Sequence, residues 1–412
     1  MIVVHEYTTA PPYINSKTML PLSSSARLLT TTASYYAIRS LRTAIFASNT
    51  LNYCVGLEES DYTQVLYVDH LPCAQPTFQA LESILGGDPR EPRGDRFVWD
   101  PWVVKCGQGK NGQEAPLPGD FDDWEPIPGE RDTASKQIQY SMTRAQCSDI
   151  FDDDTFEQLI DGITELGRSI GCSGTTPPWI SLYGSDQMQN FHMDAAQGSM
   201  AWTLSLSKGY GSTFTGGETV LLTPKVLDYW RDFDASRGRE APTLMRFLPP
   251  LFGRFVAFDG RVPHMVQRVS ANGCSPLEAR ITIHGWFADP QVIWLKGKDL
   301  EESEVADATL NESLESITDT LKSSDLGRIV GFLTVRLDIS PDGEVEDLNA
   351  VCDTLRNDPA DYRGVIGYDP EGREIMEDAS ADAKLTIQET LGKLIFPETK
   401  EGGSVVVPFD FV

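Results

Sequence analysis

The chain has few basic residues and no long apolar run, and each shortage excludes a class of protein. Its 412 residues hold 34 Lys and Arg against 61 Asp and Glu, a formal net charge of −27. Nucleic acids and anionic membranes bind basic surfaces, so we expect no nucleic acid and no membrane as a partner. No stretch approaches the roughly 18 apolar residues that cross a bilayer. The first residues also lack the basic flank and apolar run of a secretory signal.

Paired cysteines are also lacking. The seven cysteines are scattered, and none forms a Cys-x-x-Cys pair. An odd number at such spacings does not indicate a disulfide scaffold or a zinc–thiolate site. We therefore expect a soluble chain in a reducing, cytoplasmic compartment.

The hydrophobic content of 40% is ordinary for a globular protein, and the length suggests two or three folding units. The acidic charge is uneven along them. Residues 201–290 hold 10 Lys and Arg against 8 Asp and Glu, whereas the flanking parts, residues 1–200 and 291–412, have net charges of −13 and −16. The near-neutral segment is either a local fluctuation or a cleft built to hold anions.

The pattern of apolar residues changes twice along the chain. Before residue 150 we expect a helix at 31–48, a strand at 64–70 and a long loop at 86–135. Residues 152–170 have helical spacing. Six short alternating segments then follow between residues 179 and 287, interrupted by a helical excursion within 224–250, and this spacing is typical of a β-sandwich or jelly roll.

Four units follow from this pattern, in a mainly β protein. They are an N-terminal elaboration packed on the core (1–150), a jelly-roll core with flanking helices (151–295), an acidic connector (296–327), and a small C-terminal α+β domain (328–412).

Two of the five histidines lie in a pattern typical of a metal site. His192 and Asp194 are two residues apart, so on a strand both side chains point to one face. His264 follows in the segment Asp259–His264. Two histidines and one carboxylate form the facial triad of non-haem Fe(II) oxygenases, which leaves coordination positions open.

A candidate anion site accompanies the triad. Arg280 can form a bidentate pair with a carboxylate, and Thr282 adds a hydroxyl from the same strand face. Tyr183 precedes His192, and the segment Gly216–Thr219 (Gly-Gly-Glu-Thr) lies between the two ligand segments.

The order of these residues resembles the Fe(II)/2-oxoglutarate-dependent dioxygenases, and most of all their prolyl-4-hydroxylase-like branch. The resemblance covers about residues 179–290 and implies a double-stranded β-helix fold. It implies that His192, Asp194 and His264 bind Fe(II), which reacts with dioxygen. It further implies that Arg280 binds 2-oxoglutarate, with Thr282 and Tyr183 as helpers. Since Asp194 keeps the carboxylate that halogenases of the family lack, the resemblance favours oxygenation, desaturation or ring closure.

We expect a small, anionic, amino-acid-derived substrate, because cationic residues gather near the triad. Arg261 is the first candidate to bind its carboxylate, followed by Arg254 and Lys208, and Arg246 and Arg268 add to the same positive balance. His284 either lines the pocket or is a hydrogen-bonded core histidine.

Three alternatives stay open at this point. The first is oxidative cyclisation in natural product biosynthesis, as in the algal kainoid synthases of this superfamily. The second is prolyl-type hydroxylation of protein side chains, and the third is a non-catalytic, metal-binding jelly-roll module. A homodimer is also compatible with the sequence.

The C-terminal segment shows a second resemblance. Residues 328–412 contain an alternating strand, a Pro-Asp-Gly turn at Pro341–Gly343, a helix that runs into Phe396-Pro397 and a final strand with aromatic residues. This order is similar to the C-terminal domain of TonB-type proteins. The resemblance implies only an α+β fold, which could be an appendage, a cover for the active site or a dimer interface.

Overall fold

The computed structural model describes the chain in segments. They are residues 2–4, 65–85, 100–105, 138–194, 197–223, 244–271, 276–324, 329–357, 365–368, 374–376 and 379–411. The helix expected at 31–48 lies outside them, as do residues 224–243 of the expected helical excursion. The remainder of that excursion contains a strand, β11 (Met245–Leu248).

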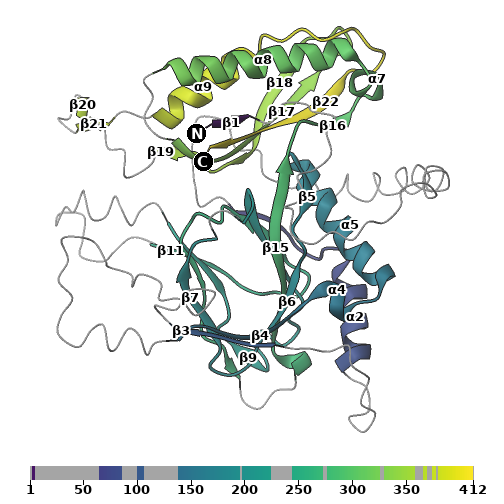
Figure 1. The fold of residues 1–412 in the computed structure, drawn as a ribbon, viewed down its shortest axis with the longest axis vertical. Coiled ribbons are helices and arrows are strands. Elements are labelled where there is room, and N and C mark those ends of the chain that lie inside the picture. Colours follow the sequence, from purple (N-terminus) through teal and green to yellow (C-terminus); the bar gives the residue numbers. More distant parts are fainter. Residues whose placement is uncertain are drawn as a thin grey trace, which may run out of the picture.

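The centre of the fold is a 12-stranded antiparallel sheet that curls into a half-barrel (Figure 1). Its strands alternate between residues that face the hydrophobic core and residues that face the inside of the curl, which is the period-2 pattern of the sequence. The fold is therefore mainly β, a jelly roll, as expected. Along the sheet the strands are β11, β10 (Thr219–Leu222), β13 (His264–Val266), β7 (Met188–His192), β4 (Ile138–Gln146), β6 (Trp179–Tyr183), β15 (Arg280–Pro290), β8 (Met200–Ser205), β12 (Phe255–Phe258) and β2 (Val65–Val68), with β3 (Asp100–Lys105) beside β4 and β5 (Cys172–Thr175) beside β15.

Strands from before residue 150 are part of this sheet. β2 pairs with β12, which confirms the strand expected at 64–70. β4 lies between β6 and β7 and pairs with both. β2, β3 and β4, which come from the region expected to be an N-terminal elaboration, therefore form part of the barrel wall, and β3 lies within the long loop expected at 86–135. A two-stranded ribbon of β9 (Phe214–Thr215) and β14 (Ser270–Ala271) and a 3₁₀ turn, η2 (Pro276–Glu278), complete this part.

Three helices cover the outer face of the sheet: α2 (Ala74–Leu85), α4 (Cys147–Ile150) and α5 (Asp153–Ser169). α5 confirms the helix expected at 152–170. The Asp152 side chain accepts a hydrogen bond from Thr155 N at 2.9 Å and so caps the helix. Its buried face contacts the core through Leu159, Ile163 and Leu166.

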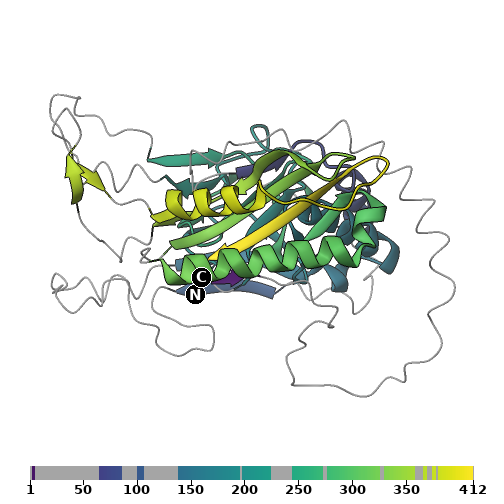
Figure 2. The same ribbon diagram turned by 90° about the horizontal axis from the view of Figure 1, so that it is seen from above.

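A second sheet lies across one end of the half-barrel. Its order is β1-β22-β17-β18, with β16 beside β22 and β19 beside β17. Two long helices, α8 and α9, cover its outer face (Figure 2), and their apolar residues form a separate core with the sheet. The bounds are β1 (Ile2–Val4), β16 (Ile293–Lys296), α7 (Lys298–Glu301), α8 (Glu304–Ser323), β17 (Ile329–Ile339), β18 (Val345–Asp353), β19 (Arg356–Asn357), α9 (Ala379–Leu391) and β22 (Gly403–Phe411), with a small hairpin of β20 (Val365–Tyr368) and β21 (Glu374–Met376).

The segment expected to be a connector is part of this second unit. In α8, Leu310, Leu314 and Ile317 are buried at helical spacing against the sheet. We call the elements from β16 to β22 the C-terminal unit. The resemblance to TonB-type domains stays a prediction. Among the residues that the structure describes, no helix is long and apolar enough to cross a membrane.

The inner face of the C-terminal sheet packs on the half-barrel. Phe332 and Cys352 are fully buried in the same core cluster as the barrel strands and α5. Thr334 Oγ1 donates a hydrogen bond to Ile170 O at 2.7 Å. The centre of the sheet is therefore covered on both faces, which explains why most residues of β17 and β22 are buried, although β17 also carries Arg336 and Asp338.

Candidate metal centre

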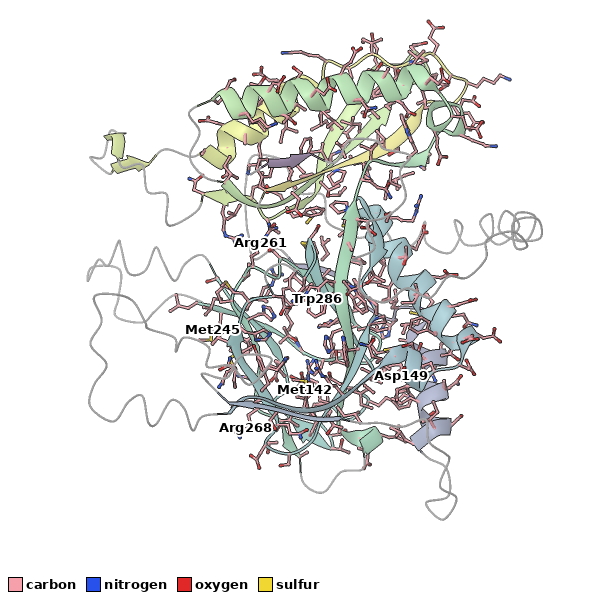
Figure 3. The ribbon with its side chains drawn as sticks, in the orientation of Figure 1. Met142, Asp149, Met245, Arg261, Arg268 and Trp286 are labelled. Atoms are coloured by element: carbon pink, nitrogen blue, oxygen red, sulfur yellow. The ribbon has the colours of Figure 1, made fainter. Side chains whose placement is uncertain are left out.

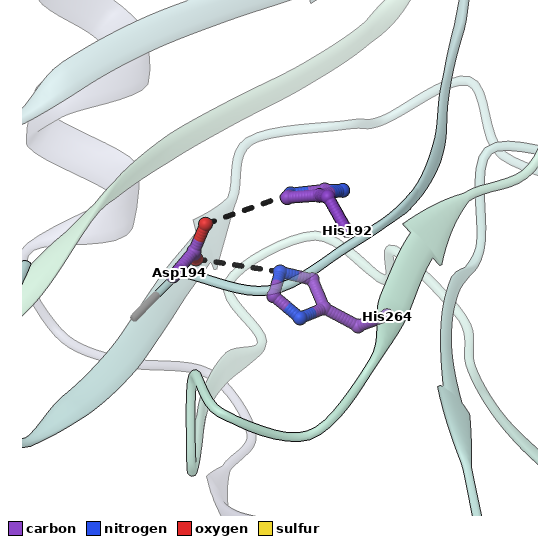
Figure 4. Close-up of side chains that lie close together, drawn as sticks. All are labelled: His192, Asp194 and His264. Carbon is purple, nitrogen blue, oxygen red and sulfur yellow. Dashed lines mark ion pairs between the residues drawn. The ribbon is translucent and has the colours of Figure 1, made fainter. Parts of the chain in front are cut away.

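Two adjacent strands bring the predicted triad together (Figure 4). His192 ends β7 and His264 begins β13, and the two residues are register partners. Asp194 lies just beyond β7, with its Oδ1 3.6 Å from His192 Nε2 and its Oδ2 3.3 Å from His264 Nε2. One candidate ligand atom from each residue falls within 4.8 Å of the others. The three side chains that the sequence pattern singled out therefore lie together in the structure.

Backbone carbonyls fix the tautomers of both imidazoles. His192 Nδ1 lies 2.8 Å from Asn190 O, and His264 Nδ1 lies 2.9 Å from Val262 O. A carbonyl only accepts hydrogen bonds, so each neutral ring carries its proton on Nδ1 and directs the Nε2 lone pair at the carboxylate. Two lone pairs and a carboxylate form a cluster of acceptors, and a divalent cation fits such a donor set.

The titration of the triad agrees with this assignment. Burial, and then the neighbouring His264, lower the pKa of His192 to about 4, so that ring is neutral at pH 7. Burial alone would raise the pKa of Asp194. The hydrogen bond and charge that a protonated His264 supplies in the absence of a metal, together with His192 and Trp286, outweigh burial and lower it. Asp194 is therefore an anion between two imidazoles.

Arg280 stands at the start of β15 with its side chain buried. Its Nε donates to Gly217 O at 2.6 Å, and its Nη2 is 3.5 Å from Thr219 Oγ1. The Nη1 atom is buried without a hydrogen-bond partner among the described residues. Burial lowers the pKa of Arg280, while Tyr183 and Glu218 oppose that shift. A buried guanidinium with an unused donor fits a carboxylate ligand.

Gly217 is required for this arrangement. Its φ is +78°, and a Cβ at this position would lie 2.7 Å from Arg280 Cδ. The Gly-Gly-Glu-Thr segment therefore passes close beneath Arg280 and turns a carbonyl toward it.

Tyr183 and Thr282 lie on the same inner face as Arg280. The ring centre of Tyr183 is 4.5 Å from Arg280 Cζ, and its hydroxyl donates to Gln189 Oε1 at 3.0 Å. Burial raises the pKa of Tyr183 to about 12, so the phenol stays neutral. Thr282 is buried and makes only long contacts of 3.4 and 3.5 Å, to Leu204 O and Ile283 O.

His284 is a hydrogen-bonded histidine of the inner face. Its Nε2 lies 3.0 Å from Ser181 Oγ. Burial lowers the pKa of His284 to about 4, with a smaller lowering by Arg280, although Asp194 opposes the shift. The neutral ring is thus close enough to Asp194 and Arg280 for their charges to affect its pKa.

The three residues favoured for substrate binding have other partners. Arg254 forms a bidentate pair with Asp69 at 2.6 and 2.9 Å. Lys208 lies 3.7 Å from the Phe78 ring centre. Arg261 Nε donates to Asp259 at 2.8 Å. These contacts occupy the side chains, so none of the three is among the substrate-binding residues proposed below.

Sequence reasoning missed several residues of the inner face. On β4, Arg144 lies with its Cζ 4.2 Å from the Trp179 ring centre, and the Tyr140 ring meets the His192 ring at 5.1 Å. The alternation of Tyr140, Met142 and Arg144 was a usable signal for a strand. Trp286 lies in β15 in step with Arg280, Thr282 and His284, and its indole is near enough to Asp194 to help lower the pKa of that carboxyl.

No protein-family model matches the sequence, and no curated protein matches it. Among solved structures, the chain is similar to a prolyl hydroxylase from Trichoplax adhaerens in complex with a hypoxia inducible factor peptide fragment. The identity is 14% and the TM-score 0.33, over 63% of this chain and 94% of that one.

Two further solved structures resemble the chain to about the same degree. A prolyl-4-hydroxylase from Pseudomonas putida shares 14% identity and a TM-score of 0.33, over 55% of this chain and 94% of that one. The epimerase SnoN, in complex with Fe3+, alpha ketoglutarate and nogalamycin RO, shares 11% identity and a TM-score of 0.31, over 54% and 78%.

Proposed function

We propose that the chain is an Fe(II)/2-oxoglutarate-dependent oxygenase that oxidises a C–H bond of a small, carboxylate-bearing molecule. The observation that carries this proposal is the convergence of His192, Asp194 and His264 within 4.8 Å, inside the barrel that also buries Arg280 with an unused Nη1. The three triad side chains are acceptors that suit a cation, and Arg280 Nη1 is a donor that suits an anion.

Fe(II), with 2-oxoglutarate and dioxygen, would supply oxidation of the substrate C–H bond, coupled to decarboxylation of 2-oxoglutarate to succinate and CO2. His192 and His264, through Nε2, and Asp194, through its carboxylate, would hold the metal. Their Nδ1 hydrogen bonds to backbone carbonyls keep both rings oriented before a metal binds. Three protein ligands leave the remaining coordination positions to the cosubstrate and dioxygen.

Arg280 binds the far carboxylate of 2-oxoglutarate in this proposal. Its Nε and Nη2 are held by Gly217 and Thr219, which orients Nη1 before the ligand arrives. The Tyr183 ring supports the guanidinium from one face, and Thr282 adds a hydroxyl on the same strand. Because the arginine is already buried, a carboxylate that binds it gains charge-assisted hydrogen bonds in a water-poor pocket.

We assign the substrate carboxylate to Arg144 because of its place on the inner face of the barrel. Arg144 is the register partner of Ser181, which in turn pairs with Thr282, so all three side chains share the inner face of the barrel. It stacks on Trp179, which fixes its plane. A cation in this position selects a small anionic substrate.

Succinate formation from 2-oxoglutarate with added Fe(II) tests the reaction class. The wild-type protein should form succinate, and His192→Ala should abolish it because one of three ligands is gone. His70→Asn, which changes an exposed histidine outside the site, should keep the activity. No succinate with any of a panel of amino acids and peptides would instead favour a non-catalytic metal-binding module.

Arg144→Gln tests the substrate class in the same assay, with substrates found in that panel. The variant should raise the KM of carboxylate substrates by about tenfold or more, while 2-oxoglutarate binds as in the wild type. Arg254→Gln, at an arginine occupied by Asp69, is the matched control. Product analysis then separates hydroxylation, desaturation and ring closure, and a peptide as the best substrate would contradict the small-molecule proposal.

A further inference from the structure

The loop between β12 and β13, residues 259–263, supports two of the three proposed ligands. His264 follows it directly, and Val262 O fixes the ring of His264. Asp194 N donates to Gly260 O at 2.7 Å. A Cβ on Gly260 would lie only 3.0 Å from the Asp194 Cβ, so the two segments are in close contact. The position of this loop therefore sets how Asp194 and His264 converge.

The Asp259 side chain at the start of the loop is fully buried. It accepts hydrogen bonds from Arg261 N at 2.9 Å and Arg261 Nε at 2.8 Å, both within the loop. The C-terminal unit supplies the others, from Thr354 Oγ1 at 3.0 Å and Arg356 Nη1 at 3.3 Å. A buried carboxylate is costly unless it is paired and hydrogen-bonded. Asp259 thus depends on the C-terminal unit for part of its stabilisation.

Asp410 in β22, the last strand, makes a second connection. Its Oδ1 lies 3.2 Å from Arg261 Nη1, and that same Nη1 donates to Phe411 O at 2.9 Å. Its Oδ2 accepts a hydrogen bond from Ser199 Oγ at 3.0 Å. Ser199 follows Asp194 along the chain, and Arg261 precedes His264. One carboxylate therefore bridges the segments that carry both ligands, and Figure 3 shows Arg261 where the two units meet.

We propose that the C-terminal unit is a positioning element of the metal centre, in which Thr354, Arg356 and Asp410 hold the loop of residues 259–263 where Asp194 and His264 converge. The inference rests on the proposed function for the identity of the metal, whereas the contacts that carry it lie outside the triad. None of the three residues belongs to the triad itself. They act through Asp259 and Arg261.

The test compares Asp410→Asn and Thr354→Val with wild type in the full-length, metal-free protein. Thr354→Val removes one donor at nearly constant shape. Glu346→Gln, an exposed carboxylate on β18 of the same sheet, is the matched control. One measurement is the affinity for Co(II) alone, by calorimetric titration. The other is hydrogen exchange at the amides of Asp194 and Val262, which reports on the loop without any metal.

Both variants should bind Co(II) about tenfold more weakly, at the low end of the loss typical for residues that orient metal ligands. The two amides should exchange faster, and Glu346→Gln should behave as wild type. Wild-type affinity and exchange in both variants would overturn the proposal, even if their thermal stability fell, because the unit would then be only a structural support.

A pair of arginine variants keeps the proposal testable if Asp410→Asn does not fold. Arg356→Ala removes the pairing with Asp259, whereas Arg356→Lys keeps a cation there and should recover most of the Co(II) affinity. Equal affinities in the two variants would count against positioning. A wild-type protein that binds no Co(II) would contradict the proposed function instead, and the exchange measurement would still decide the role of the C-terminal unit.

Discussion

The guanidinium of Arg280 lies 4.5 Å from the centre of the Tyr183 ring, across a register pair of β15 and β6. No carboxylate among the described residues forms an ion pair with it, and Nη1 has no hydrogen-bond partner there. A buried cation held by a carbonyl and an aromatic face is poised for an anion that arrives from solution. In our proposal this pairing is the anion site of the barrel, separate from the metal ligands.

Replacement of Arg280 by lysine should weaken the binding of 2-oxoglutarate to the protein. Lysine keeps the charge but loses the planar fork and the fixed contacts to Gly217 and Thr219. Loss of one charge-assisted hydrogen bond costs about 1.5–3 kcal/mol, so we expect an increase in Kd of roughly 10- to 100-fold. Titration of the Mn(II)-loaded wild type and variant with 2-oxoglutarate measures this Kd.

Arg268→Lys is the control for that change. Arg268 is exposed and donates to Asp186 O at 2.9 Å on the outside of the same region. Its replacement should leave the Kd of 2-oxoglutarate unchanged. Equal weakening by both substitutions would show that the effect comes from overall charge and not from a specific pocket.

Trp286→Phe should weaken metal binding although the ring volume is largely kept. The indole Nε1 is buried, has no hydrogen-bond partner among the residues that the structure describes, and still contributes to lowering the pKa of Asp194. Removal of this N–H should raise the pKa of Asp194 and lower the affinity for Co(II) a few-fold, toward the lower limit seen for groups that orient ligands.

The chain offers a matched control for the tryptophan. Trp294 is also buried, and its Nε1 likewise has no hydrogen-bond partner within the described part of the chain, but it packs on Phe396 in the core of the C-terminal unit. Trp294→Phe should lower the free energy of unfolding by a similar amount, because it loses similar packing, and should leave the affinity for Co(II) unchanged. If both substitutions reduced affinity equally, the indole N–H of Trp286 would have no specific role.

His284 should make the stability of the metal-free protein depend on pH. Burial lowers its pKa to about 4 in the folded state, compared with 6.5 for an exposed histidine. Between these values the unfolded chain binds a proton that the folded chain does not, so stability falls as pH falls from about 6.5 toward 4. The contribution is on the order of 3 kcal/mol.

Urea unfolding of wild type and His284→Gln across that range measures this linkage. The glutamine does not titrate, so the variant should lose less free energy of unfolding on acidification. Parallel curves for the two proteins would contradict the assignment of a buried, neutral histidine. Above pH 6.5 the histidine contributes no pH dependence in either state, so both curves should be parallel there.

The local pattern of the sequence was sufficient for much of the fold. Six short segments between residues 179 and 287 were predicted as strands, and β6, β8, β10, β12, β13 and β15 lie at these positions. The same reasoning predicted that His192 and Asp194 share one face, and the structure places Asp194 beside both His192 and His264. The helical spacing of α5 was equally clear.

Long-range pairing was not visible in the same way. β4 is separated from β6 and β7 by α4, α5 and β5 and follows a segment rich in Gly and Pro, so its place in the barrel wall depends on contacts that no local pattern encodes. Arg261 shows the same limit. Its position three residues before His264 suggested the substrate, but its partner Asp410 lies near the far end of the chain.

The two glycines Gly217 and Gly211 provide the sharpest test of the anion pocket. Their φ values are +78° and +79°, so alanine at either position costs a similar amount, about 1–2 kcal/mol, for the left-handed backbone. A Cβ at Gly211 meets nothing within 4 Å, whereas one at Gly217 would lie 2.7 Å from Arg280 Cδ. Only Gly217→Ala should therefore displace the guanidinium.

In both variants the strain of a left-handed backbone should lower the free energy of unfolding by a similar amount. Gly217→Ala should lower it further, because the new Cβ would press against Arg280 Cδ. The Kd of 2-oxoglutarate should rise roughly tenfold in Gly217→Ala, as expected when a charge-assisted hydrogen bond is misplaced, and stay unchanged in Gly211→Ala. Unchanged 2-oxoglutarate binding in a folded Gly217→Ala protein would mean that Arg280 is not the residue that holds the far carboxylate. Since the metal ligands are untouched by either substitution, Co(II) affinity in both variants should equal that of the wild type.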